Sequence, residues 1–79
     1  MKLNYYIREM DDAFKIAIGV ARKRNKYIGY ICGYLDGALT YIRYCAMEDR
    51  EISGMDYDDL ISYSKELTRR FEEDENKSI

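Results

Sequence analysis

The stretch that decides the fold is residues 27–47, YIGYICGYLDGALTYIRYCAM, which is apolar and repeats with the period of an α-helix. Its aliphatic side chains recur every three or four positions, so they share one face that we expect to form the core: Ile28, Ile31, Cys32, Leu35, Leu39, Ile42 and Ala46. Asp36 lies near the middle of the stretch, where a charge would cost roughly 2.5–3.5 kcal/mol at the centre of a bilayer. The sequence therefore predicts a buried helix here and no membrane span.

Two further faces of this helix carry its unusual residues. A stripe of five tyrosines runs beside the core face: Tyr27, Tyr30, Tyr34, Tyr41 and Tyr44. The remaining face holds Gly29, Gly33 and Gly37, each of which costs about 1 kcal/mol relative to alanine inside a helix. Because glycines four residues apart let another backbone approach closely, we expect this face to contact a helix of the same monomer or of a dimer partner.

Two flanking segments, at about 4–24 and 56–72, also have helical periodicity. The first places one apolar arc along its length: Tyr6, Ile7, Met10, Ala13, Phe14, Ala17, Ile18 and Ala21. An extended conformation for residues 3–7 is the alternative at its start. In the last segment we expect Asp56 to be the N-cap and Met55 to pack on Leu60. Residues 73–79 are acidic and polar, and we expect them to fray.

These segments predict an all-α fold, a small three-helix bundle in a single domain of residues 1–72 with helices at about 4–24, 27–47 and 56–72. The central, Tyr/Gly-rich helix should be largely buried. It carries apolar or aromatic side chains over more than half of its circumference, which is more than two neighbours readily cover. We therefore also expect self-association as a homodimer.

Composition excludes several functional classes. The 79 residues include no histidine, the usual general base near neutral pH, and Cys32 and Cys45 have no obvious activating partner. We therefore predict a non-enzymatic protein with no cofactor and no metal site. With 13 basic and 15 acidic residues, the chain lacks the positive charge of a nucleic-acid binder, so we do not expect direct nucleic-acid binding. Two thiols about 20 Å apart on one helix cannot pair, which fits a reducing compartment and predicts a cytoplasmic location.

Two features favour a protein-binding role. Tyrosine buries a large area and keeps a polar tip, which suits recognition surfaces, although rings at the edge of the core are the alternative. Acidic residues concentrate after position 47, where they could occupy a basic surface or could merely be solvated. The candidate partner-binding residues are Tyr27, Tyr30, Tyr34, Tyr41, Glu48, Asp49, Glu51, Asp56, Asp58 and Asp59, and the candidate helix-contact residues are Gly29, Gly33 and Gly37.

The size, the acidity and the missing catalytic set resemble those of small accessory proteins of phages and mobile elements, including inhibitors of bacterial defence systems. That resemblance implies a protein partner, such as a nucleic-acid-binding protein whose basic surface would be blocked. Our first hypothesis is thus a helical protein-binding module that acts as an inhibitor. The alternative is a self-associating structural or regulatory module that forms a homodimer through the glycine face.

Overall fold

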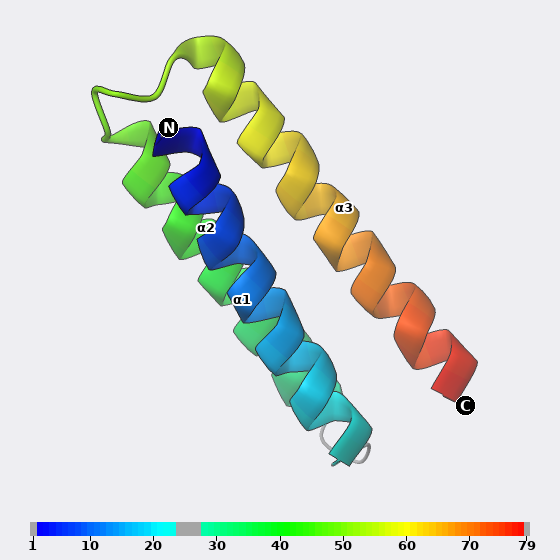
Figure 1. Ribbon diagram of the computed structural model, residues 1–79. Coiled ribbons are helices and arrows are strands. Elements are labelled where there is room, and N and C mark those ends of the chain that lie inside the picture. The colour runs from blue at the N-terminus through cyan, green and yellow to red at the C-terminus, as the bar shows by residue number, and fades with distance from the viewer. Residues whose placement is uncertain (1, 24–27, 79) are drawn as a thin grey trace.

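The computed structural model describes the backbone of residues 2–23 and 28–78, with side chains for residues 2–23 and 31–74. Three helices follow one another: α1 (Lys2–Lys23), α2 (Ile28–Met47) and α3 (Gly54–Ser78). Each helix packs against the other two, with α2 running opposite to α1 and α3 (Figure 1). The bundle measures 41 × 17 × 16 Å. The described ranges contain no strand, so the predicted all-α three-helix bundle is confirmed.

The core forms where the three apolar faces meet along the bundle axis. Side chains with less than a tenth of their surface exposed come from every helix: Tyr6, Met10, Ala13, Ala17 and Ala21 of α1, Ile31, Leu35, Leu39 and Ala46 of α2, and Leu60, Ser64, Leu67 and Phe71 of α3. Ser64 is the polar member of this set, and its hydroxyl donates a hydrogen bond of 2.8 Å to the carbonyl of Ile61. The predicted core faces of the first two helices are thus the ones that pack.

The described helices extend beyond the predicted bounds at both ends of the chain. α1 begins at Lys2, two residues before the predicted start, so the predicted helix and not the extended alternative describes residues 3–7, and only a helix brings Tyr6 and Met10 together into the core. The predicted end of the first helix, at residue 24, lies outside the described residues. Residues 73–78, which we expected to fray, continue α3. The Arg22 guanidinium lies 3.3 Å from the Asp74 carboxylate, and Arg69 pairs with Glu73 one turn away, so both contacts favour the helical tail.

The start of α3 is capped by Ser53, not by Asp56. The Ser53 hydroxyl accepts the backbone N–H of Asp56 at 3.1 Å, and the Ser53 carbonyl accepts that of Tyr57 at 2.9 Å. Asp56 therefore lies in the first turn, at the third helical position. Met55 is 81% exposed and does not pack on Leu60, because the earlier helix start rotates Met55 outward.

The expected burial of the tyrosine and glycine faces of α2 is not confirmed. Tyr34, Tyr41 and Tyr44 are exposed, and a Cβ added to Gly33 or Gly37 would have no heavy atom within 4 Å. α1 and α3 both pack on the aliphatic side of α2, and two neighbours leave the opposite side uncovered. The close helix contact predicted for these two glycines is therefore absent within the described monomer.

Over the described ranges, no helix combines the length and the apolar character needed to cross a bilayer.

Candidate interaction surface

The side of α2 that faces away from α1 and α3 is rich in exposed aromatic and small residues. We call it the outer face of α2, and it consists of Gly33, Tyr34, Gly37, Thr40, Tyr41, Tyr44 and Met47. Tyr34 is 46% exposed, Tyr41 70% and Tyr44 61%. Rings at the edge of a core would have kept only their hydroxyl tips in water. For Tyr34, Tyr41 and Tyr44, the exposed fractions are larger than a place at the core edge would leave.

An apolar groove lies beside the outer face, between α2 and α1. Its volume is about 340 Å³, and it is lined by Ile16, Ala17, Val20, Ile31 and Tyr34. Ile16 and Val20 are 53% and 41% exposed, so the groove opens to solvent. Tyr34 thus belongs to both the groove and the outer face, which makes them one continuous apolar surface.

Tyr41 lies further along the same edge of α2, towards the N-terminal end of α1. A hydrogen bond between the side chains of Tyr41 and Cys45 raises the pKa of the Tyr41 hydroxyl above its usual value. The two thiols do not form a disulfide. Tyr41 therefore stays neutral near pH 7, and its ring presents an uncharged surface.

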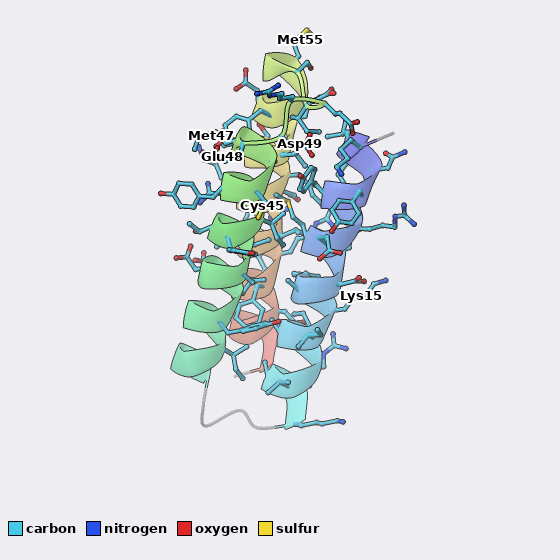
Figure 2. The ribbon with its side chains drawn as sticks, turned by 90° about the vertical axis from the view of Figure 1, so that its left-hand side faces the viewer. Lys15, Cys45, Met47, Glu48, Asp49 and Met55 are labelled. Carbon is cyan, nitrogen blue, oxygen red and sulfur yellow. The ribbon has the colours of Figure 1, made fainter. Side chains whose placement is uncertain are left out.

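The outer face runs into a cluster of carboxylates at one end of the bundle. This acidic end comprises Glu48, Asp49, Glu51, Asp56, Asp58 and Asp59. Figure 2 shows Met47 and Glu48 side by side at the end of α2, with Met55 at the tip of the bundle. Glu48, Glu51, Asp58 and Asp59 are exposed, whereas Asp49 and Asp56 are half-buried. The predicted carboxylates thus adjoin the outer face of α2 where Glu48 follows Met47.

Asp49 differs from the other carboxylates because it holds the bundle end together. It accepts a hydrogen bond of 2.7 Å from the Tyr6 hydroxyl and one of 2.9 Å from the backbone N–H of Glu51, and Lys2 lies 3.6 Å away. The hydrogen bond to the Asp49 carboxylate, with burial, raises the pKa of Tyr6 to about 12. The same bond holds the pKa of Asp49 below its usual value. Asp49 is thus engaged within the chain.

The outer face of α2 is bordered on its α1 side by the apolar groove, and on its α3 side by a polar groove between α2 and α3. Its volume is about 280 Å³, and its walls carry charges of both signs: Asp36 and Arg43 on α2, and Lys65, Arg69 and Glu72 on α3. Arg69 is bound by Glu66, and this contact lowers the pKa of Glu66 to about 2. Arg43 donates a hydrogen bond of 3.1 Å to the Thr40 hydroxyl. The guanidinium groups of Arg43 and Arg69 are therefore held in place at the walls of this groove.

Tyr63 of α3 also contacts a carboxylate, since its hydroxyl donates a hydrogen bond to Asp11 of α1. This hydrogen bond raises the pKa of Tyr63. Among the described side chains, no three histidine, cysteine, aspartate or glutamate residues gather as a metal site would require.

Three predicted site residues lie outside the part of the chain whose side chains are described. Tyr27 lies outside the described residues, and the surroundings of Gly29 and Tyr30 lie outside the part whose side chains are described. Conversely, sequence reasoning missed Ile16, Val20 and Met47. The signal for the first two was present, because both are apolar and fall off the core arc of α1.

Comparison of the chain with protein-family models, with curated proteins and with solved structures gave no match.

Proposed function

We propose that this protein is a non-enzymatic, cytoplasmic protein-binding module that contacts its partner through the outer face of α2 and the adjoining acidic end. The observation that carries the proposal is the exposure of Tyr34, Tyr41 and Tyr44, at 46%, 70% and 61%. Aromatic rings that remain in solvent contribute little to the stability of the bundle. They supply large contact area at low cost in conformational entropy, which is why they are enriched at interfaces.

The acidic end gives the proposed partner its chemistry. Glu48, Glu51, Asp58 and Asp59 are exposed, and the segment 48–59 contains a single basic residue, Arg50. A basic protein surface, such as one that normally binds nucleic acid, complements this end. Exposed charges steer encounter and set the association rate, whereas buried aromatic contacts set the dissociation rate. An inhibitor of the kind encoded by phages or mobile elements would use the two in this way.

Capture from an extract of the native host tests the proposal. The wild-type chain is compared with Tyr34→Ser/Tyr41→Ser, with Asp58→Lys/Asp59→Lys, and with the control Lys15→Ala, whose side chain points away from α2 (Figure 2). We expect one basic protein that the wild type and the control retain, that the tyrosine variant loses, and that the lysine variant binds more slowly. Equal capture by all four proteins, or capture by none, would refute the proposal.

The alternative is a self-associating module, and one observation favours it specifically. The outer face of α2 places the open backbones of Gly33 and Gly37 on the same side as the exposed ring of Tyr44, so one copy offers both small and large positions to another.

A further inference from the structure

We infer that the outer face of α2 binds a second copy of this chain, with the two α2 helices antiparallel about a two-fold axis. The inference rests on the exposed surface that the proposed function also uses: where a second copy covers the outer face of α2, the acidic end alone remains for a host partner. In this arrangement the acidic end of each copy stays exposed.

The outer face has the spacing of a helix–helix seam. Positions 33, 37, 40, 44 and 47 follow one another at intervals of four, three, four and three residues, which is the heptad repeat of two packed helices. Gly33, Gly37, Tyr44 and Met47 are exposed and Thr40 is half-buried, so the whole seam is accessible to a partner. None of the five is charged.

Antiparallel pairing places large residues of one copy against small residues of the other. In a heptad seam that pairs antiparallel, Tyr44 meets Gly33 of the second copy, and Gly37 meets Thr40 of the second copy. A Cβ at Gly33 or Gly37 would meet no heavy atom within 4 Å in the monomer, so the space above both backbones is open to a tyrosine ring. This match accounts for glycines in a helix that they otherwise destabilise.

Charges on one edge of the seam specify the same orientation. Asp36 and Arg43 flank the seam on the α3 side, seven residues apart. Like edges meet in an antiparallel pair, so Asp36 of each copy lies beside Arg43 of the other, twice per dimer. Neither residue forms an ion pair with any other residue that the structure describes. The groups facing this edge from α3 are Lys65, Arg69 and Glu72.

The opposite edge of the seam is apolar. Tyr34 and Tyr41 occupy equivalent heptad positions there, so antiparallel pairing brings Tyr41 of the second copy beside Tyr34. At this place the groove of about 340 Å³ opens between Tyr34, Ile16 and Val20. The ring of Tyr41, 70% exposed in the monomer, fits this apolar groove in size and in polarity.

The accessible area is sufficient for a dimer of moderate strength. The three tyrosines, Met47, Ile16 and Val20 are each between 41% and 70% exposed, which amounts to on the order of 600 Å² per copy. A standard stable interface buries about 800 Å² per partner. We therefore expect a dissociation constant on the order of micromolar.

Sedimentation of the 79-residue chain over a range of concentrations tests the dimer. The wild type should exceed the monomer mass of 9.4 kDa at micromolar concentration. Gly33→Leu fills the space opposite Tyr44 and should weaken the dimer by at least about 30-fold without lowering the melting temperature of the monomer. Gly19→Leu is the matched control, because its Cβ also meets open space but lies on α1. Dimerisation unaffected by Gly33→Leu, or equally weakened by both variants, would overturn the inference.

Charge exchange tests the orientation. Asp36→Arg and Arg43→Asp should each raise the dissociation constant about tenfold, because each single variant sets like charges together twice. The double variant exchanges both charges and should restore the dimer to within about threefold of the wild type. Failure of the double variant to restore it would exclude the antiparallel pairing.

The outcome also separates this inference from the proposed function. If the chain sediments at 9.4 kDa at all concentrations but captures a host protein through its tyrosines, the inferred dimer is wrong and the proposed function stands. A chain that stays monomeric and captures nothing overturns both.

Discussion

The inner and outer faces of α2 belong to one helix of 20 residues, yet they follow opposite rules. On the inner face, Leu35 and Leu39 are 2% exposed, whereas Tyr41 and Tyr44 on the outer face are 70% and 61% exposed. The inner face uses aliphatic side chains that can only stabilise the bundle. The outer face combines rings left in water with glycines that weaken the helix. The difference indicates that folding depends on the inner face, and the outer face is the one that we propose for interaction.

The strongest test of this division is a charge on the inner face. Leu35→Asp should unfold the protein, because an unpaired carboxylate in the core costs more than the few kcal/mol by which a chain of this size is stable. Circular dichroism should show the loss of helix at 25 °C. The matched substitution Tyr41→Asp on the outer face should leave the monomer folded. A folded Leu35→Asp variant would mean that the inner face is not the core.

A smaller loss of stability should follow from removing the hydrogen bond between Tyr6 and Asp49. The pKa of Tyr6 is raised from 10.0 to about 12 in the folded protein, so its neutral form is stabilised there. That contribution is fully present below pH 10 and is lost as the pH rises from 10 to about 12. Tyr6→Phe should lower the melting temperature at pH 7 and should reduce the decline between pH 10 and 12.

The same hydrogen bond should make the stability of the protein depend on pH in acid, through Asp49. Its pKa lies below the usual 3.8, so its contribution is present above that pH and is lost on further acidification. Melting temperatures measured across both pH ranges, with Asp49→Asn as the second variant, check the pair. Identical alkaline profiles for wild type and Tyr6→Phe would contradict the assignment.

A gain in stability is expected on the outer face. Gly37→Ala should stabilise the monomer by about 1 kcal/mol, because alanine is the better helix former and the added Cβ meets no heavy atom within 4 Å. Thermal denaturation at concentrations below the dimer dissociation constant measures this gain. A destabilised monomer would show that the backbone of α2 is closely approached after all.

The smallest effect on stability should come from the acidic end. Asp58→Lys/Asp59→Lys should change the free energy of unfolding by less than about 0.5 kcal/mol, since both side chains are exposed. Its effect on association should be larger: a slower on-rate that depends less on ionic strength. Stopped-flow measurements with the captured partner at two salt concentrations provide the readout.

The core could be predicted from the sequence and the surface only in part. Leu35 and Leu39 repeat with helical period and are too apolar to lie elsewhere, so periodicity alone assigns them. Tyr34 and Tyr41 have the same periodicity, but tyrosine is stable both at a core edge and in water. Their exposure depends on where α1 and α3 pack, which periodicity does not specify.

Two further differences between prediction and structure lie at the ends of α3. One reflects two nearby residues that can each cap the helix, and the other reflects a contact between residues far apart in the sequence. Ser53 and Asp56 are both good N-caps, so composition could not choose between them. The helical end of α3 is favoured by an ion pair between Arg22 and Asp74, which are 52 residues apart in the chain. No local pattern in the acidic tail indicates that contact.

The concentration of carboxylates at one end has a consequence for valency. In the antiparallel arrangement each copy directs its acidic end the opposite way along a bundle 41 Å long, so the dimer would carry two binding sites separated by about that distance. One small basic protein could not contact both sites. Two basic surfaces on a larger assembly could, and the second contact would then form at a high effective concentration. Avidity would thus let two weak sites hold a target that neither retains alone.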